Sequence, residues 1–475
     1  MEHYFDPASW AKHVYGGCQL GDKRRTKRLT SLAASFASQP SASIPAACGG
    51  DTARQEGAYR FIENDHVDAA DIEEGTSKRI LKDAEKHDVV LAIQDTTAVT
   101  YDHALRKQLG HTGSTYTRAM NVHSVLLVAP EEKGIIGLGV QKWWIRKKVR
   151  KSKLEYQKIP YEKKESYKWQ ETLALLLART KRHDNLISVC DREADIYEFL
   201  QFHDDQQLRY VIRSNTSRNL MAGKGKLRDT LKKQPVLGTR NVLVQQRGPG
   251  VSKSSGKRRP PRSMRVAQTE IRSCTVTLKP SGRGQTKIKR PLRVNAVLVT
   301  EVSCPIGETP LNWLLLTTEK VDTFQQAELV VSYYEQRWLI EEFHKCWKTG
   351  CALEKKRLQE VGNLERIMVI LAPIAARLLH LRSVYESRPN ASCSELMSKV
   401  EWVCLYLSVN PKKRKAPSTA PTIKWALQAV ARLAGWTDTK RTGRIGWETL
   451  WKGWMKLEDM ADGFKVALHM QGVTL

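Results

Sequence analysis

The spacing of hydrophobic and polar residues changes twice along the chain. Over residues 1–64 the apolar side chains recur every three or four positions, as Leu29, Leu32 and Phe36 do. Beyond residue 364 the same helical period returns. Between these parts, short apolar runs bounded by turn residues are typical of β-strands. We therefore predict helices at both ends of the chain and a β-sheet in its middle.

The middle of the chain alternates strand-like runs with amphipathic stretches. Strands are predicted at 89–95, 121–129, 134–144, 186–191 and 208–214, and helices at 170–180 and 194–202. Residues 121–144 read as a hairpin. The elements follow the order of an RNase H-like domain: three strands, a helix, a strand, a helix, a strand and then a helix. The predicted fold class is therefore α/β, with an RNase H-like mixed-sheet core.

About a hundred residues separate the last of these strands from the next long helix, too many for a simple loop. Alternating stretches such as IRSCTVTL and RVNAVLVTEV predict a β-rich insertion at about 215–312. We divide the chain into a helical module at 1–65, a mixed-sheet domain at 66–370 and a helical domain at 371–475. The apolar stretch 364–382 contains Pro373 and arginines, which favours a kinked core helix over a membrane span.

The net charge of +28 indicates a polyanionic partner. DNA or RNA fits this charge, whereas an anionic membrane lacks support, because the chain has no lipidation motif and no long uncharged apolar run. The nine cysteines form no CxxC pair, and the first residues lack the order of a secretory signal, so we expect a cytoplasmic protein with reduced thiols. The glycines of 250–256 are spaced too widely for a phosphate loop, and we expect no nucleotide cofactor.

The segment 333–348, YYEQRWLIEEFHKCWK, has the pattern of an amphipathic helix. A continuous helix places Tyr334, Arg337, Glu341 and Lys348 on one face, and places an apolar set on the opposite face. Arg337 and Glu341 also fit a simple ion pair between neighbouring turns. That simpler reading leaves Tyr334 and Lys348 unexplained.

Two aspartates follow apolar strands far upstream, Asp95 after VVLAIQ and Asp191 after LISVC. Carboxylates that meet at neighbouring strand ends repel unless a cation neutralises them, and Mg²⁺ is held by a few carboxylates, water and phosphate oxygens. With Glu341 they make three carboxylates that suit two-metal phosphoryl transfer, with Mn²⁺ as a substitute. The alternatives are a helix N-cap for Asp191 and a turn for Asp95. Arg213, His344 and Lys345 lie close to this predicted site in the pattern.

Several stretches together resemble the bacterial cut-and-paste DDE transposases of insertion sequence family four, YREK subgroup. They span residues 20–366 and include LGDKRRTKRL, QEGAYRFI, QDTT, VCDREADI, VIRS, GETPLNWLLLT, YYEQRWLIEEFHKCWKTG and NLER. The resemblance departs from the family pattern at Ser38, Gln39 and Gln359. Those departures concern which end sequence is recognised, and leave the expected chemistry unchanged.

The resemblance implies a role for each part of the chain. Asp95, Asp191 and Glu341 become the metal-binding catalytic triad, and Tyr334, Arg337 and Lys348 the phosphate-contacting set. Trp313 is expected to stack on a base flipped out near the cleaved end. The remaining expected DNA contacts are Arg24, Arg25, Arg28, Arg60, Arg213, His344, Lys345, Arg357 and Asn363.

The expected activity is nicking, hairpin formation and strand transfer on double-stranded DNA, both transposon ends and target. The resemblance also implies a homodimer in a synaptic complex, joined through the C-terminal helices, and a bacterial cytoplasmic protein that associates with the nucleoid. Two alternatives remain open: a structure-specific RNase H-like nuclease, and a catalytically silent DNA-binding regulator of the element.

Overall fold

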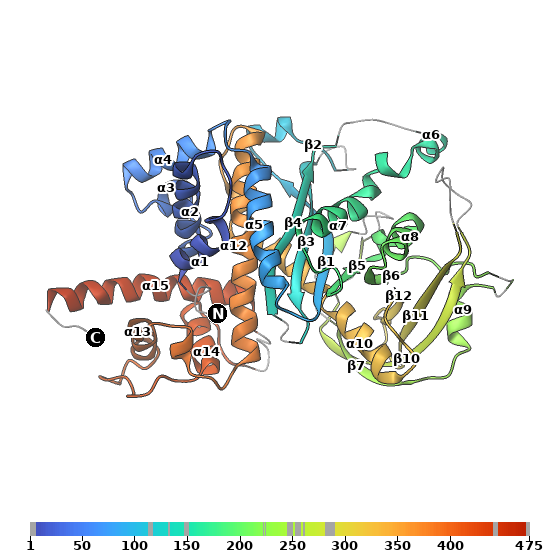
Figure 1. Ribbon diagram of the computed structural model, residues 1–475. Coiled ribbons are helices and arrows are strands. Elements are labelled where there is room, and N and C mark those ends of the chain that lie inside the picture. Colours follow the sequence, from blue (N-terminus) through green and yellow to red (C-terminus); the bar gives the residue numbers. More distant parts are fainter. Residues whose placement is uncertain are drawn as a thin grey trace. The chain divides into compact units, whose positions relative to one another are not determined.

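The computed structural model separates into two compact units (Figure 1). Unit 1 comprises Met1–Asp88, Thr96–Lys148 and Leu339–Leu475, and unit 2 comprises Val89–Asp95 and Val149–Trp338. The structure describes residues 6–112, 117–131, 134–146, 152–221, 223, 225–244, 250–251, 258–259, 262–280, 290–439 and 445–471.

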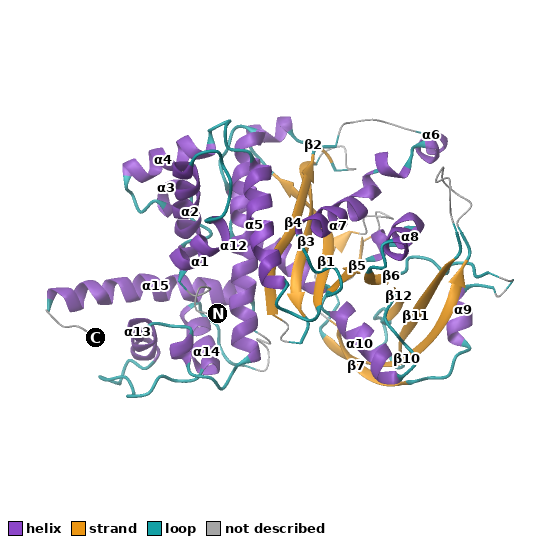
Figure 2. Ribbon diagram, in the orientation of Figure 1, coloured by secondary structure: helices purple, strands orange, loops and turns teal. Residues whose placement is uncertain are grey.

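Unit 1 is mostly helical (Figure 2). Its α-helices are α1 (Pro7–Tyr15), α2 (Lys23–Ser38), α3 (Ile44–Ala47), α4 (Thr52–Ile62), α5 (Ala69–Ala84), α11 (Trp338–Lys345), α12 (Val361–Ser387), α13 (Lys399–Val409), α14 (Ile423–Leu433) and α15 (Trp447–Met470). Its short turns of helix are η2 (Ala104–Gln108), η6 (Cys346–Gly350), η7 (Leu353–Lys355) and η8 (Cys393–Glu395). Strands β2 (Gly110–His111), β3 (Arg118–Ala129) and β4 (Gly134–Trp144) also belong to it.

The N-terminal helices begin where the sequence supplies capping carboxylates. Asp22 caps α2, Asp51 caps α4 and Asp68 caps α5, each accepting a hydrogen bond from a backbone N–H of the first turn. The buried side chains of α2 are Leu29, Leu32, Ala33, Phe36 and Ala37. The helical N-terminal part predicted from the apolar spacing is thereby confirmed, and so is the hairpin, because β3 and β4 pair antiparallel.

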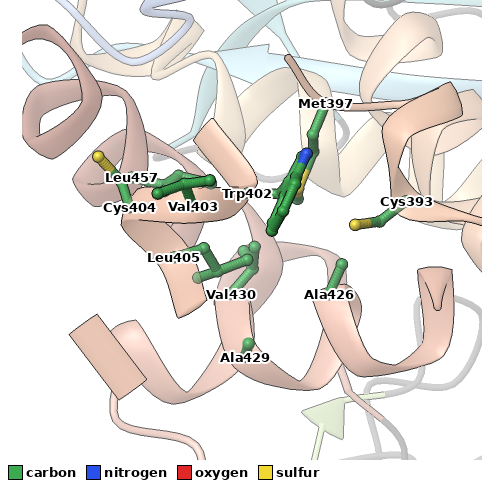
Figure 3. Packing of buried hydrophobic residues seen from close by; sticks show 10 residues of the cluster. All are labelled: Cys393, Met397, Trp402, Val403, Cys404, Leu405, Ala426, Ala429, Val430 and Leu457. Atoms are coloured by element: carbon green, nitrogen blue, oxygen red, sulfur yellow. The ribbon is translucent and has the colours of Figure 1, made fainter. Parts of the chain in front are cut away.

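The C-terminal helices have an apolar core of their own (Figure 3). Trp402 and Leu405 from α13 pack with Ala426 and Val430 from α14 and with Leu457 from α15. Burial of this kind contributes roughly 25 cal/mol per Å² of apolar surface removed from water. Burial of these apolar side chains therefore stabilises the packing of α13, α14 and α15 against one another.

Helix α12 is long and apolar enough to cross a membrane by length and composition, over Val361–Val384. However, 83% of its apolar window is buried inside the protein. The helix continues past Pro373 to Ser387, although the proline itself has no N–H to donate. This finding agrees with the prediction of a core helix.

Unit 2 is built on a mixed sheet. Its strands lie in the order β1-β5-β6-β12-β11-β10-β7. Of β1 (Val90–Thr100), only the residues up to Asp95 belong to unit 2. The other strands are β5 (Leu186–Cys190), β6 (Arg209–Arg213), β7 (Gly238–Val244), β10 (Arg265–Leu278), β11 (Leu292–Glu301) and β12 (Asn312–Thr317). A separate short pair is formed by β8 (Gly250–Val251) and β9 (Arg258–Arg259). Strand β5 is parallel to β1 and β6, and the later strands are antiparallel to their neighbours.

The helices of unit 2 follow the predicted order. They are α6 (Lys153–Lys158), η3 (Tyr161–Lys163), η4 (Glu165–Tyr167), α7 (Lys168–Arg179), η5 (Arg192–Ala194), α8 (Tyr197–Asp205), α9 (Leu227–Lys232) and α10 (Phe324–Glu335). The predicted α/β class with a large mixed sheet is confirmed. Apart from the short β8–β9 pair, the described strands of the β-rich insertion belong to the core sheet, because β12 pairs with β6 and β11, β10 and β7 extend the sheet from there.

One prediction about local structure is wrong. The segment 333–348 is not a single helix, because α10 ends at Glu335 and α11 begins at Trp338. The N–H groups of Gln336 and Arg337 bond to carbonyls three residues back, which tightens the last turn and closes α10. After Lys345 the chain continues as a π-helical turn at Cys346–Gly350. The single face predicted to unite Tyr334 and Lys348 is therefore absent, although the apolar set (Tyr333, Ile340, Phe343 and Trp347) is buried as expected.

The phosphate-loop comparison at 250–256 falls mostly outside the described residues, as does the basic stretch around it.

Candidate active site

Asp191 directly follows β5, but Asp95 lies inside β1, which continues to Thr100, so the strand end and the turn predicted at Asp95 are both absent. Strands β1 and β5 are parallel, and Gln94 lies opposite Cys190, so the two aspartates follow at the same edge of the sheet. Burial raises the pKa of the Cys190 thiol well above its usual value, and the negative charges of Asp191 and Asp95 raise it further. The sheet thus brings together two carboxylates that are far apart in sequence.

Asp191 has two roles in this geometry. Its side chain accepts a hydrogen bond of 2.8 Å from the Glu193 amide and caps the short turn η5. The capping alternative drawn from the sequence is therefore real. It coexists with the position beside Asp95, because one carboxylate oxygen is engaged by the amide while the residue stays partly exposed.

Tyr334 of α10 lies close to the same carboxylate, surrounded by two arginines. Burial raises the pKa of its hydroxyl, while the nearby guanidinium groups of Arg337 and Arg213 lower it and the charge of Asp191 raises it. The Trp313 ring meets the Tyr334 ring edge-on at 5.0 Å between centroids, and the Arg337 guanidinium lies 6.0 Å from that same ring. Unit 2 therefore gathers these predicted residues around Asp191.

The sequence analysis missed Arg228. From α9, this residue donates a hydrogen bond of 2.5 Å to the Asn312 side chain, while Arg213 donates one of 3.1 Å to the Asn312 carbonyl. Both guanidinium groups thus bind Asn312, the residue that precedes Trp313 in the chain. Arg228 had no signal of its own, since it lies in a short helix more than 80 residues upstream of its partner.

Unit 1 contains the remaining predicted catalytic residues on α11 and η6. Glu341 lies in the first turn of α11 and is partly exposed. Lys348 donates a hydrogen bond of 2.8 Å to the Ala98 carbonyl and forms an ion pair of 3.3 Å with Glu354. Glu354 also accepts hydrogen bonds from the N–H and the hydroxyl of Thr100, at 2.8 and 2.9 Å. Lys348 is therefore tied to the second half of β1 by a carboxylate that the sequence analysis did not single out.

The other predicted contacts near α11 differ widely in exposure. His344 is buried, and burial lowers its pKa to about 3, so its neutral ring brings no positive charge to a phosphate. Lys345 is exposed. Arg357 is 72% exposed and lies 3.8 Å from Asp102. Asn363 is buried and accepts a hydrogen bond of 2.9 Å from Arg366, which gives it an internal contact.

The N-terminal helices present a basic surface. Arg24 and Arg28 of α2 are exposed, and Arg25 donates hydrogen bonds to the carbonyls of Leu20 and His66. Arg60 of α4 is 81% exposed and pairs with Glu56 at 3.2 Å. The Arg28 guanidinium lies so close to Gly57 that a Cβ there would come within 2.6 Å of it, so glycine allows α2 and α4 to approach.

A cavity of about 1160 Å³ runs along α2. Its lining includes lysines, arginine and hydroxyl groups: Lys23, Thr26, Lys27, Thr30, Ser31, Ser35 and Arg54. Such a mixture of cations and hydroxyls suits contact with a phosphate backbone. Of these residues, Lys23, Lys27 and Arg54 were not among the predicted contacts, although the basic run at 23–28 was the signal that pointed to α2.

The carboxylates of unit 2 fit a hard divalent cation in kind, since oxygen donors from two strand ends are the ligands that Mg²⁺ and Mn²⁺ accept. Among the described side chains, no group of three His, Cys, Asp or Glu residues is gathered closely enough to hold a metal ion. Asp95 and Asp191 belong to unit 2 and Glu341 to unit 1.

Comparison with known proteins assigns both parts of the chain. Residues 7–67 match the family model described as Transposase DNA-binding, and residues 165–377 match the model described as Transposase DDE domain. A cryo-EM structure of the piggyBac transposase synaptic complex with hairpin DNA aligns with 97% of this chain and 82% of that chain, at 8% identity and a TM-score of 0.37. A TM-score this low establishes no shared fold.

The two family matches define the class of protein: a DNA-binding and DNA-cleaving transposase of the DDE type. Within this chain, a transposase DNA-binding domain precedes a transposase DDE domain. Transposase DDE domains have an RNase H-like core and depend on divalent metal ions. The predictions of fold class, of a DNA partner and of DNA-cleaving activity are thereby confirmed.

Proposed function

We propose that the chain is a cut-and-paste transposase of insertion sequence family four, YREK subgroup, which binds the ends of its element and moves it through hairpin intermediates. The observation that carries this proposal is the pairing of β1 with β5, which sets Asp95 and Asp191 at one edge of the sheet beside Tyr334 and Arg337.

In this proposal Asp95, Asp191 and Glu341 hold the metal, which is Mg²⁺ with Mn²⁺ as a substitute. Bound there, two such ions supply Lewis acidity to the attacking and leaving oxygens of phosphoryl transfer. The chain's own residues position the substrate. Arg213 and Arg337 grip the phosphates beside the scissile bond, and Tyr334 orders them.

Trp313 lies partly exposed at the end of this group, against the edge of the Tyr334 ring. We assign it the stacking of a base displaced from the duplex, which recovers roughly 1–3 kcal/mol of the unstacking cost. Of the remaining predicted contacts, Lys345, Lys348 and Arg357 extend the DNA-binding surface. His344 and Asn363 are buried, so we assign them the support of that surface from inside the protein.

The N-terminal module binds the element's end through Arg24, Arg25, Arg28 and Arg60. The cavity along α2 is lined by other cations, among them Lys23, Lys27 and Arg54, which extend the same basic module. Domain limits of 1–65, 66–370 and 371–475 belong to the same proposal, as do a homodimer acting in a synaptic complex and a bacterial cytoplasmic location at the nucleoid. The basic surface supports contact with DNA, because Lys and Arg side chains that neutralise phosphates release the counterions condensed on the DNA.

The proposal is tested with a supercoiled plasmid that carries the inverted repeats flanking the coding region. With Mg²⁺ or Mn²⁺, the wild-type chain should release hairpin-ended fragments and then join them to target DNA. Asp95→Ala, Asp191→Ala and Glu341→Ala should bind the ends and leave them uncut. Asp184→Ala is the matched control, because Asp184 lies just before the start of β5 and pairs with Arg182 at 3.0 Å; it should cut normally.

The two alternatives give different results in the same experiment. A silent regulator would bind the ends and cut nothing under either metal. A structure-specific nuclease would cut branched DNA without the repeats and would transfer no strand. Either result would overturn the proposal, as would normal cutting by any of the three alanine variants.

A further inference from the structure

The carboxylate of Asp191 is placed by a short turn. Its residue has extended backbone angles at the end of β5, and the turn η5 that follows has one residue, Ala194, buried. The next two side chains, Arg192 and Glu193, are exposed. The hydrogen bond from the Glu193 amide to the Asp191 side chain exists only while this turn keeps its shape. The orientation of the carboxylate therefore depends on what fixes the far end of the turn.

Asp195 fixes that far end. Its side chain is 1% exposed and accepts hydrogen bonds at both oxygens. One oxygen accepts from the Ser214 hydroxyl at 2.9 Å and from the Asn215 amide at 2.8 Å. The other accepts from two nitrogens of Arg218, with Nε at 2.8 Å and a terminal nitrogen closer still.

Arg218 completes the connection through a third bond. Its terminal nitrogen donates to the backbone carbonyl of Asp195 at 2.9 Å, and its guanidinium lies 5.7 Å from the Tyr197 ring centroid. Only 12% of the Arg218 side chain is exposed. Two Arg218 nitrogens therefore meet one carboxylate oxygen, and one of them also meets the carbonyl of the same residue, so the guanidinium is bound to both the side chain and the backbone of Asp195.

Two connections therefore hold the turn, one on each side. Before it, Cys190 pairs with Ile212 in the parallel β5–β6 ladder, and after it, Asp195 is bound to the segment that follows β6. Both oxygens of Asp195 are occupied by donors, which leaves this acid engaged in holding the chain. Asp191, four residues earlier, remains partly exposed at the sheet edge.

We propose that the buried Asp195–Arg218 pair is a positioning device that aims the Asp191 carboxylate at the metal position. The inference rests on the proposed function, since it gives Asp195 and Arg218 their purpose through Asp191. Removing Arg218 leaves a buried carboxylate without its charged partner, and the turn relaxes toward solvent. Residues that orient metal ligands typically change metal affinity by about 10- to 100-fold when they are removed.

The chain offers a control arginine at the start of β6, whereas Arg218 lies beyond the end of that strand. Arg209 pairs with both carboxylate oxygens of Glu319, at 2.9 and 2.6 Å. Arg209→Met and Arg218→Met each remove one arginine from an arginine–carboxylate pair. Only the second pair adjoins the turn that carries Asp191.

The test measures Mn²⁺ binding to the full chain with its end DNA, using electron paramagnetic resonance of free Mn²⁺, together with thermal unfolding. Asp191→Ala should lose the tight Mn²⁺ binding. Arg218→Met should weaken it by about tenfold or more, Arg218→Lys should fall between, and Arg209→Met should match wild type. Cutting by Arg218→Met should recover at high Mn²⁺ concentration, which a purely structural defect would not show.

The outcomes separate the two levels of inference. If Asp191→Ala binds Mn²⁺ as wild type does, the proposed metal site is wrong. If Asp191→Ala loses binding but Arg218→Met keeps wild-type affinity, only the positioning role is overturned. If Arg218→Met does not fold, Asp195→Asn replaces it, because the amide keeps the size of the side chain; the same weakening supports the inference and unchanged affinity overturns it.

Discussion

The cations of α2 and the cations in and before α12 belong to the same unit, yet they face opposite surroundings. On α2, Arg24 and Arg28 are exposed to solvent. In the other group, Lys356, Arg366 and Arg377 are buried, at 5%, 8% and 4% exposure. A net charge counts both groups alike, but only the first can release counterions from DNA.

Arg366 and Arg377 bind carbonyls at the ends of N-terminal helices, whereas Lys356 binds a carbonyl in the loop between α2 and α3. Arg366 donates to the carbonyls of Ile62, at the end of α4, and Val67, at 2.8 and 2.6 Å. Arg377 donates at 3.0 Å to the carbonyl of Ala37 in the last turn of α2, and Lys356 donates to that of Ala42. The last carbonyls of a helix have no partner within the helix and carry partial negative charge, so a cation is well placed there. Arg366 and Arg377 thus hold the ends of α4 and α2, and Lys356 holds the loop that follows α2.

The largest loss of stability is expected when Arg366 is replaced. Arg366→Met leaves two buried carbonyls without their charged donor, and we expect the free energy of unfolding to fall by ~3 kcal/mol. Chemical denaturation followed by circular dichroism measures this. Arg357→Met is the control, because Arg357 is 72% exposed and has only a distant acidic partner; its change should stay within about 0.5 kcal/mol. Equal losses in the two variants would contradict the division into buried and exposed groups.

Lys356 gives a smaller effect with a pH signature. Burial lowers its pKa from 10.5 to about 8. Because its pKa is lower in the folded chain, the unfolded chain binds more protons between pH 8 and pH 10.5, so stability due to this residue rises with pH across that window and is lost below it. The neighbouring Cys351 thiol, whose pKa burial raises to about 12, stays neutral there.

The measurement is the difference in unfolding free energy between the wild-type chain and Lys356→Met, from pH 7 to pH 10.5. The difference should climb in favour of the wild type by at most ~1.4 kcal/mol per pH unit. Lys355→Met, which changes an exposed neighbour, should show no such slope. A flat or falling difference for Lys356→Met would mean that this ammonium group is not desolvated in the folded chain.

Much of the fold was readable from the sequence, because it depends on local patterns. The apolar runs before Asp95 and Asp191 predicted both strands, although β1 continues past Asp95 to Thr100, and the parallel pairing of β1 with β5 then brings these acids together. The break between α10 and α11 was not readable, since Gln336 and Arg337 are acceptable helix residues and the interruption comes from how the turn closes.

The roles of individual charges were also beyond the sequence. Asp195 and Arg218 are 23 residues apart, and Arg366 lies about 300 residues from the carbonyls it binds. No periodicity links such partners, because they meet only through the packing of the whole unit. The pattern that revealed a basic protein therefore could not say which arginines hold it together.

The smallest effect on stability, and the sharpest test of the comparison, is expected at Arg28. Its side chain is exposed and rests against Gly57, so Arg28→Ala should change the free energy of unfolding by less than ~0.5 kcal/mol. End binding should weaken all the same, and the slope of log affinity against log salt should decrease by about one, as for one lost phosphate contact. Gel-shift titrations from low to moderate salt measure this slope.

Arg182→Ala, which removes an arginine of unit 2 paired with Asp184, should leave the slope unchanged. If Arg28→Ala instead destabilised the fold as Arg366→Met does and left the slope intact, exposure would not separate DNA-binding cations from structural ones, and the charge of α2 would have to be explained by packing.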